Sequence, residues 1–218
     1  MKTFRIKICG IKQSEHATVA HEAGADAIGL NFYERSLRSV TVKEAQTIAQ
    51  AIPAEVARIG VFVNMAADQI NEIADAVQLD WVQLHGDETT DWVVKIDRPV
   101  IRAVRVDPQS VLDSGSSESQ SIQKWIDSGV KKILLDARSP KGYGGTGETI
   151  DWASVGRLEL SVPMILAGGL NQWNVAEAIG LANPDGVDTA SGVEKFPAGK
   201  DAEMIRAYVK AAAEAFAG

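Results

Sequence analysis

Residues 4–32, FRIKICGIKQSEHATVAHEAGADAIGLNF, place a helical stretch between two short apolar runs. The runs FRIKIC and DAIGLNF are rich in apolar residues and bounded by Gly or Asp, a pattern typical of strands. The stretch between them, SEHATVAHEAG, has the apolar spacing of a helix. Because a strand reached through a helical crossover joins its sheet in parallel, the segment predicts a right-handed β-α-β unit.

The same alternation continues along the chain. Further candidate strands are VARIGVFV (56–63), DWVQLH (80–85), PVIRAVRV (99–106), KKILLDA (131–137), VPMILAGG (162–169) and DGVDTASG (185–192). Further candidate helices are TVKEAQTIAQAI (41–52), AADQINEIADAV (66–77), QSIQKWIDSG (120–129) and DAEMIRAYVKAAAEAF (201–216). Such alternation predicts a doubly wound parallel sheet or a (β/α)8 barrel. Eight β units in 218 residues favour the α/β class with a single-domain (β/α)8 TIM barrel over residues 1–218, in which DSGSSESQS (113–121) is a surface loop.

Composition limits the classes of partner. The formal net charge of −7 and the pI near 5.0 disfavour nucleic acid and anionic membranes, which both reward basic surfaces. The single cysteine cannot form an internal disulfide, and MKTFRIK lacks the apolar core of a signal peptide, so we expect a cytoplasmic protein. No apolar run approaches the roughly 20 residues of a membrane span. The histidines and the cysteine show no metal-ligand spacing, and we expect neither metal nor cofactor.

Active sites in (β/α)8 barrels lie at the C-terminal ends of the strands. The first strand ends at Cys9, and alternation places Phe4, Ile6 and Ile8 on one face with Lys7 and Cys9 on the other. We expect Lys7 and Cys9 to point into the barrel, about 6 to 7 Å apart at a rise of roughly 3.3 Å per residue. A neighbouring ammonium favours the thiolate and lowers the pKa of the thiol toward neutrality. The alternative is that Cys9 is a small core residue.

Asp136 ends the apolar strand KKILLDA. A carboxylate there is costly to desolvate without a partner, so we expect its side chain to face the polar mouth of the barrel, where it can act as a general acid. The alternative is a helix cap or an anchor for the following loop. The first and sixth strands lie well apart around the ring, so Cys9 and Asp136 would flank a ligand as base and acid.

Three glycine-bearing segments follow the last strands: KGYGGTGET (141–149), AGGLNQWNV (167–175) and DTASGVE (188–194). Free backbone N–H groups in such loops bind anions, and the loops after strands seven and eight form the frequent phosphate site of these barrels. The residues expected at a phosphorylated small molecule are Gly145, Gly147, Gly168, Gly169, Ser191 and Gly192. An anionic ligand is therefore compatible with an acidic protein.

Two further residues near the predicted mouth are candidates. Arg38, in FYERSLRSV, is either a solvated loop residue or the fork that binds a second anionic group such as a carboxylate. His85, in VQLHGDE, is either a third acid/base group or, as we expect, a histidine hydrogen-bonded to the loop.

These residues together resemble a known family. KICGI, GLNFYERSLRSV, GVFVN, VQLHGDE, LLDA with GGTGETIDW, AGGLNQWNV and DTASGVE are similar, in order, to the signature of phosphoribosylanthranilate isomerases of tryptophan biosynthesis. The resemblance covers residues 7–194. It implies that Cys9 is the general base, Asp136 the general acid, Arg38 the contact to the anthranilate carboxylate and Asp188 a group near the sugar hydroxyls. Ala190 departs from the two serines that the family often carries before the loop glycine, which removes a side-chain contact there.

The implied reaction is an Amadori rearrangement of N-(5-phosphoribosyl)anthranilate to 1-(2-carboxyphenylamino)-1-deoxyribulose 5-phosphate, which needs an acid and a base but no metal or redox cofactor. Two alternatives remain. Another phosphosugar barrel enzyme, such as an indole-glycerol-phosphate synthase or an aminoaldose isomerase of histidine synthesis, would share the glycine loops but not Cys9 with Arg38. A non-catalytic barrel would only bind the phosphorylated ligand. The sequence leaves open whether the protein is a monomer or a homodimer.

Overall fold

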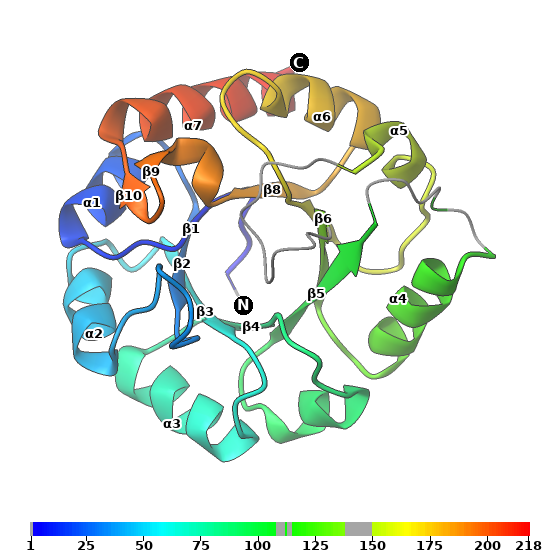
Figure 1. Cartoon of the computed structure of the whole chain (residues 1–218), viewed down its shortest axis with the longest axis horizontal. Coiled ribbons are helices and arrows are strands. Elements are labelled where there is room, and N and C mark those ends of the chain that lie inside the picture. The colour runs from blue at the N-terminus through cyan, green and yellow to red at the C-terminus, as the bar shows by residue number, and fades with distance from the viewer. Residues whose placement is uncertain (1, 108–111, 113–114, 138–149) are drawn as a thin grey trace.

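The computed structural model describes residues 2–107, 112, 115–137 and 150–218. Parallel strands close into a barrel in chain order, and β1 pairs with β8 to complete the ring (Figure 1). The strands are β1 (Ile6–Cys9), β2 (Ala27–Asn31), β3 (Ala57–Phe62), β4 (Trp81–Leu84), β5 (Val100–Val106), β6 (Lys132–Ala137), β7 (Met164–Leu166) and β8 (Gly186–Thr189). The barrel predicted from the sequence is confirmed, and the doubly wound sheet is excluded.

Helices surround the strands. They are α1 (Ser14–Glu22), α2 (Val42–Gln50), α3 (Ala67–Val77), α4 (Ser117–Asp127), α5 (Trp152–Val155), α6 (Val175–Ala182) and α7 (Ala202–Ala217), with the 3₁₀ turns η1 (Thr90–Lys95) and η2 (Ser191–Val193). The connection from β4 to β5 carries only η1 in place of a full helix. None of the described helices is long and apolar enough to cross a membrane.

The serine-rich stretch 113–121 was expected to be a surface loop, and this is wrong for its second half. Helix α4 begins at Ser117, because the hydroxyl of Ser116 accepts a hydrogen bond from the backbone N–H of Ser119 at 3.2 Å. Serine is a poor residue for a helix interior but one of the best at the position before the first turn. The run of serines therefore starts a helix rather than delaying it.

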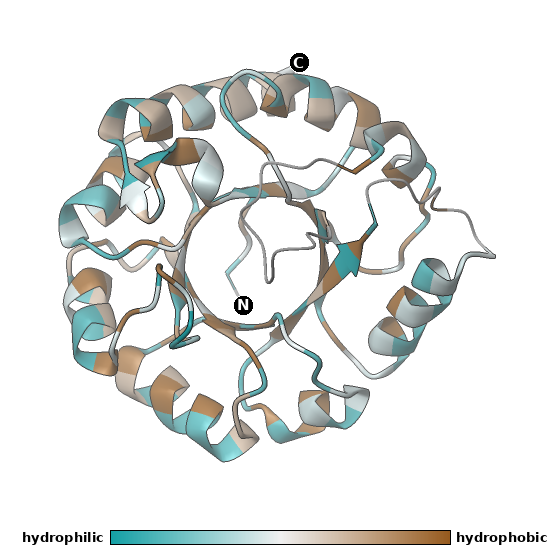
Figure 2. Cartoon of the chain, viewed as in Figure 1, coloured by the Kyte–Doolittle hydropathy of each residue, from teal (hydrophilic) through white to brown (hydrophobic). Residues whose placement is uncertain are grey.

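Alternation along the strands produces two separate cores. In Figure 2 the surrounding helices carry both hydrophobic and hydrophilic residues. One packs between the strands and the surrounding helices and includes Ile6, Ile8, Ile28 and Leu30. The other fills the barrel from inside: Phe4, Ala27, Ala57, Ile59, Trp81, Ile101, Ala103, Leu134, Ile165 and Ala167. This inner packing makes the barrel a filled support, and the polar inward side chains that follow further along the strands are placed at its mouth.

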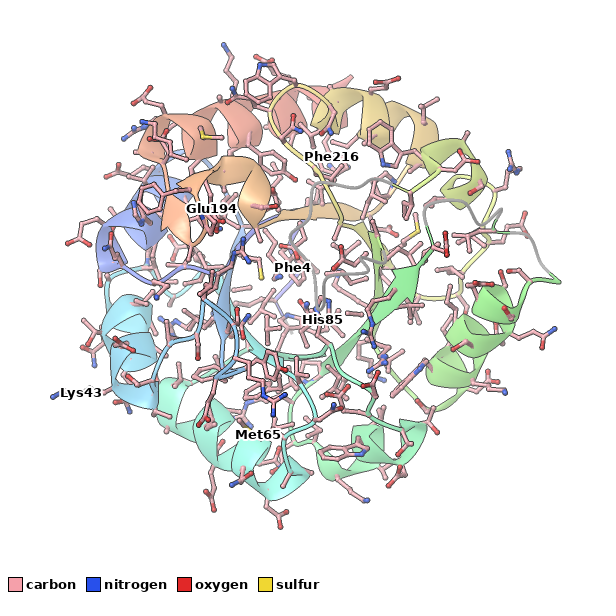
Figure 3. All side chains as sticks on the ribbon, in the orientation of Figure 1. Phe4, Lys43, Met65, His85, Glu194 and Phe216 are labelled. Atoms are coloured by element: carbon pink, nitrogen blue, oxygen red, sulfur yellow. The ribbon has the colours of Figure 1, made fainter. Side chains whose placement is uncertain are left out.

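The predicted alternation of the first strand is wrong at its start. Phe4 belongs to the inner core rather than to the face of Ile6 and Ile8, and in Figure 3 it lies within the ring of strands. Its ring meets Trp81 edge to face at 5.8 Å, while Arg5 turns outward over the ring of Phe216. Strand β1 begins only at Ile6, so the residues before it do not follow the pleat.

Lys132 is a buried cation in this inner core. Its ammonium lies 4.8 Å from the ring centre of Phe4 and 5.7 Å from that of Trp81, and it forms no ion pair with any described residue. Burial lowers the pKa of Lys132, with Asp185 opposing the shift. The unfolded chain therefore binds the proton more tightly, and stability should rise as the pH approaches the ordinary lysine pKa.

We expect Lys132→Met to raise the Tm at pH 7, because it keeps the apolar stem and removes the charge that burial disfavours. A gain of about 2 to 4 °C would correspond to roughly 1 kcal/mol in a chain of this size. Differential scanning calorimetry at pH 7 and pH 10 measures it, and the difference between variant and wild type should shrink at the higher pH. A lower Tm at both pH values would mean that the contacts with the two rings outweigh desolvation.

An antiparallel hairpin between β8 and α7 was not predicted. It consists of β9 (Glu194–Phe196) and β10 (Gly199–Lys200) and turns back over the β1 side of the barrel (Figure 1). Each strand is too short to show a periodic pattern in the sequence. The hairpin places two buried charged residues, Glu194 and Lys200, beside the mouth of the barrel.

Candidate functional site

A pocket opens at the C-terminal ends of the strands. Eight of the residues proposed from the sequence line it: Cys9, Arg38, His85, Asp136, Gly168, Gly169, Asp188 and Ser191. They come from β1, β6, β8 and the connections that follow β2, β4, β7 and β8. Gly192 does not line the pocket, and Gly145 and Gly147 lie outside the described residues.

Cys9 stands beside a buried ion pair. The ammonium of Lys7 is fully buried and donates to Asp188 on the neighbouring strand β8 at 2.9 Å. Strand β2 leaves room for the thiol because residue 29 is glycine: a Cβ there would lie 2.7 Å from Cys9 Sγ. Cys9 therefore points into the barrel as predicted, and Lys7 lies below it with its charge shared with a carboxylate.

The expected pKa of Cys9 is corrected by this arrangement. Burial raises the pKa of the Cys9 thiol above its ordinary value, and the negative charge of Asp188 raises it further. Lys7 and Lys200 act in the opposite direction by attracting the thiolate, but they do not outweigh burial. The prediction that the pKa of Cys9 falls toward neutrality is therefore wrong, because burial of the thiol outweighs the attraction of Lys7, which Asp188 partly offsets.

Alkylation of Cys9 by iodoacetamide should become faster with rising pH, with a midpoint above that of an ordinary cysteine. Cys9 is the only cysteine, so mass spectrometry of the intact chain reads the reaction directly. Lys7→Met should move the midpoint higher still, because it removes a cation and leaves Asp188 unpaired. A midpoint at or below the ordinary value would contradict the burial argument, and one that Lys7→Met leaves in place would exclude Lys7 from the electrostatics of Cys9.

Asp136 lies on the wall of the pocket contributed by β6. Its Oδ2 is 3.3 Å from Nε2 of His85, an approach whose angle is not that of a hydrogen bond. The other ring nitrogen of His85 lies 2.9 Å from the side-chain amide of the fully buried Gln83. Among the described residues the ring thus contacts side chains of β4 and β6, so the expected bond from His85 to the loop is wrong. Gln83 therefore orients the His85 ring, and His85 presents its other nitrogen to Asp136.

Arg38 is fixed from two sides. Its Nε and Nη2 donate to the two oxygens of Glu194 at 2.8 and 2.7 Å, a bidentate pair that spans from the β2–α2 connection to β9. Its aliphatic stem lies over Gly10, where φ is +73° and a Cβ would come 2.5 Å from Cδ of Arg38. Arg38 is therefore neither a solvated loop residue nor an unpaired cation.

The loops after β7 and β8 meet at the pocket. Gly168 has φ +84°, and a Cβ there would lie 2.5 Å from the backbone nitrogen of Ala137, so only glycine fits. Gly192 was predicted to bind phosphate, but its role here is steric: a Cβ at this position would lie 1.9 Å from the carbonyl oxygen of Leu170. Gly192 allows the two loops to approach each other, while Gly168, Gly169 and Ser191 face the pocket.

Three residues of the site were missed by sequence reasoning. Gln83 contacts His85, and Glu194 and Lys200 form a buried pair at 2.7 Å next to Arg38. Glu194 falls within DTASGVE, but only Asp188, Ser191 and Gly192 of that stretch were predicted to bind the ligand. Gln83 alternates inward with Trp81 on β4, which was the available signal. Within the described ranges, no group of three His, Cys, Asp or Glu side chains is placed to hold a metal ion.

Comparison with known proteins agrees with this geometry. A family model described as N-(5'-phosphoribosyl)anthranilate isomerase matches residues 6–211. The N-(5'-phosphoribosyl)anthranilate isomerase of Pseudomonas savastanoi pv. phaseolicola is 44% identical over 211 residues, which cover 97% of this chain and 98% of the relative. The crystal structure of phosphoribosyl anthranilate isomerase from Thermotoga maritima superposes with a TM-score of 0.84 at 37% identity, covering 97% of this chain and all of that one.

A further solved structure carries a ligand. It is a phosphoribosyl anthranilate isomerase in complex with reduced 1-(o-carboxyphenylamino)-1-deoxyribulose 5-phosphate, with a TM-score of 0.78 and 36% identity over 97% of this chain and 100% of that one. The family model covers nearly the whole chain. The chain belongs to the N-(5'-phosphoribosyl)anthranilate isomerase family.

Proposed function

We propose that the chain converts N-(5'-phosphoribosyl)anthranilate into 1-(2-carboxyphenylamino)-1-deoxyribulose 5-phosphate, an aldose–ketose isomerisation of tryptophan biosynthesis. The observation that carries the proposal is that Cys9 on β1 and Asp136 on β6 line one pocket from separate parts of the ring. A thiol and a carboxyl group on separate walls of one pocket could serve as the one base and the one acid that this reaction needs.

The residues divide the reaction into two proton transfers. Asp136 gives a proton to the ring oxygen of the ribose, and the C1′–O bond breaks as the anilino nitrogen forms a Schiff base with C1′. Cys9 as thiolate then removes the proton from C2′, and the electron pair of that C–H bond moves toward the nitrogen to give an enolamine. Tautomerisation of the enolamine produces the ketone. Because the pKa of Cys9 is raised, kcat/KM should increase with pH through the neutral range.

The remaining residues bind and orient the substrate. Backbone N–H groups of the β7 and β8 loops, at Gly169 and Ser191, receive the phosphate. Oδ2 of Asp188 is held by Lys7, whereas its buried Oδ1 has no described partner and is free to accept from a sugar hydroxyl. Arg38, on the β2–α2 connection beside Glu194, binds the carboxylate of the anthranilate ring.

The test is a continuous assay of the fluorescence of N-(5'-phosphoribosyl)anthranilate incubated with the purified chain. We expect the signal to decay in proportion to enzyme concentration, without added metal or cofactor. Binding of the reduced product analogue with no decay would support a non-catalytic barrel instead. Turnover of the aminoaldose of histidine synthesis alone would assign the chain to the other class of phosphosugar isomerase.

Arg38→Ala is expected mainly to raise KM, by about 10- to 100-fold, the loss of a charged hydrogen bond to the substrate carboxylate. The kcat should change little, because the carboxylate is held equally in the ground state and in the transition state. Arg35→Ala is the matched control, since Arg35 is an exposed arginine of the same loop outside the pocket. A KM that Arg38→Ala leaves unchanged would remove Arg38 from the binding site.

Assembly and location are further parts of the proposal. We propose one domain for the chain, acting in the cytoplasm as a monomer or a homodimer on a phosphorylated small molecule. A Thermotoga maritima structure of this family is of monomers generated from a dimeric enzyme, so a dimer occurs in a neighbour. Light scattering coupled to size-exclusion chromatography measures the molar mass and distinguishes the two states.

A further inference from the structure

The β9–β10 hairpin brings a buried carboxylate into contact with Arg38. The side chain of Glu194 is 3% exposed and that of Arg38 17% exposed, so the pair is largely removed from water. Oε1 of Glu194 accepts from Arg38 Nε at 2.8 Å and from the ammonium of Lys200 at 2.7 Å. Oε2 accepts from Arg38 Nη2 at 2.7 Å and from the backbone N–H of Ala198 at 3.1 Å. Both oxygens are therefore fully used by described donors.

These contacts leave a defined edge of Arg38 for a ligand. Glu194 occupies Nε and one hydrogen of Nη2, whereas Nη1 and the other Nη2 hydrogen donate to no described residue. Arg38 lines the pocket, and its stem is held on the backbone at Gly10. The Nε–Nη2 edge of the guanidinium thus contacts Glu194, and the Nη1–Nη2 edge can donate to a ligand. The plane of the guanidinium is therefore fixed before any ligand binds.

Lys200 completes the arrangement from the second strand of the hairpin. Its side chain is 1% exposed, and its ammonium donates both to Glu194 and to the carbonyl oxygen of Ala190 at 2.6 Å. Although burial opposes ionisation of Glu194, the hydrogen bonds from Arg38 and the charge of Lys200 keep its pKa below the ordinary value. Glu194 is consequently a carboxylate between two cations, and the hairpin is tied to the loop after β8 that lines the pocket. In Figure 3, Glu194 lies at the rim of the barrel and His85 inside it.

We propose that Glu194 is a positioning residue that sets the guanidinium of Arg38 to bind the carboxylate of the substrate, and that the β9–β10 hairpin thereby contributes to specificity for a carboxylated aromatic amine. The inference rests on the proposed function, because it assumes that Arg38 meets that carboxylate. A fixed guanidinium binds more tightly than a mobile one, since the ordering entropy is spent in folding rather than in binding. Glu194 itself does not touch the substrate.

The test is a double-mutant cycle of Glu194→Gln with Arg38→Ala, measured by kcat and KM. Glu194 accepts from Arg38 Nε, Arg38 Nη2, the Lys200 ammonium and the backbone N–H of Ala198. A glutamine has only one acceptor oxygen, so it cannot form the bidentate pair with the Arg38 guanidinium. We expect Glu194→Gln alone to raise KM about tenfold with kcat within about threefold of wild type, and to have no further effect in the Arg38→Ala background. An equal increase of KM in both backgrounds, or none in either, would overturn the proposal.

A second substrate separates recognition of the carboxylate from general damage. The N-(5'-phosphoribosyl) derivative of aniline lacks the carboxylate, so its KM should be the same for wild type and Glu194→Gln. A merely structural role of Glu194 would raise the KM of both substrates. Glu203→Gln is the control for the substitution, because its side chain is 85% exposed on α7 and pairs with the surface residue Arg206.

Two further measurements keep the outcome decisive. If Glu194→Gln does not fold, the double variant Glu194→Gln with Lys200→Met is used instead. It also removes the ammonium that would otherwise be buried opposite the amide. We expect the same increase of KM for the carboxylated substrate alone. The Kd of the reduced product analogue, measured by calorimetry, should rise about tenfold in the Glu194 variants. This measurement reports binding of the carboxylate independently of turnover. Wild type that binds the analogue but does not turn over would contradict the proposed reaction alone. A Kd unchanged by Glu194→Gln would contradict the positioning role alone.

Discussion

Replacing Cys9 by alanine is expected to lower kcat by at least about 10²-fold while leaving the fold intact. The substitution removes the group that takes the C2′ proton, and no other described base faces the pocket from β1. Lys7 donates directly to Asp188 at 2.9 Å, so we expect this ion pair to remain when the neighbouring thiol is removed. The fluorescence assay gives kcat and KM, and circular dichroism with thermal melting checks the fold.

Cys9→Ser is the matched variant for this prediction. It keeps a small polar side chain at the strand end but replaces the thiol with a hydroxyl, which ionises far less readily. We therefore expect it to be about as inactive as Cys9→Ala. Near-normal turnover of the alanine variant would exclude Cys9 as the base, and a serine variant close to wild type would indicate that Cys9 only shapes the pocket.

Asp136→Asn is the second large effect, with kcat again reduced by at least about 10²-fold. Asparagine keeps the shape of the side chain but has no proton to give to the ring oxygen, so ring opening should become the slow step. His85, 3.3 Å away, remains in place and does not replace the acid, since its own position is set by Gln83. The same assay measures kcat, and single-turnover kinetics separates ring opening from the later steps.

Asp185→Asn is the control for the loss of one carboxylate. Asp185 precedes β8 at the opposite end of the barrel, where it accepts a hydrogen bond from the backbone N–H of Met164. We expect a normal kcat for this variant, with a lower Tm because Asp185 also offsets the burial of the Lys132 ammonium. If Asp136→Asn also retained normal kcat, Asp136 would not be the general acid, and His85 would become the candidate.

The barrel could be predicted because its signal is local. Each strand carries its own apolar run and each long helix its own spacing, so the order of elements follows from short windows of sequence. The C-terminal ends of parallel strands meet on one face, and this rule placed Cys9, Arg38 and Asp136 around one pocket, to which the family resemblance added Asp188. The prediction failed at Phe4 and at Ser117, where the end of an element rather than its interior determines the backbone.

The electrostatics could not be predicted in the same way. Burial in the folded barrel raises the pKa of Cys9, and Asp188, which lies far away in sequence but on the strand next to β1, raises it further and pairs with Lys7. Spacing along one strand shows which side chains share a face, but it does not show which charges are compensated by another element. The direction of the shift was therefore wrong although the neighbour, Lys7, was right.

The sequence by itself determined the barrel, the face that carries the pocket and most of the residues that line it. These follow from periodicity and from the rule that strand ends converge. Only the tertiary structure decided how those residues are held: Lys7 on Asp188, Gln83 on His85, and Arg38 on Glu194. Burial makes each of these contacts obligatory, because a polar group removed from water needs a partner, and that partner is supplied by another strand or hairpin wherever the fold brings one near.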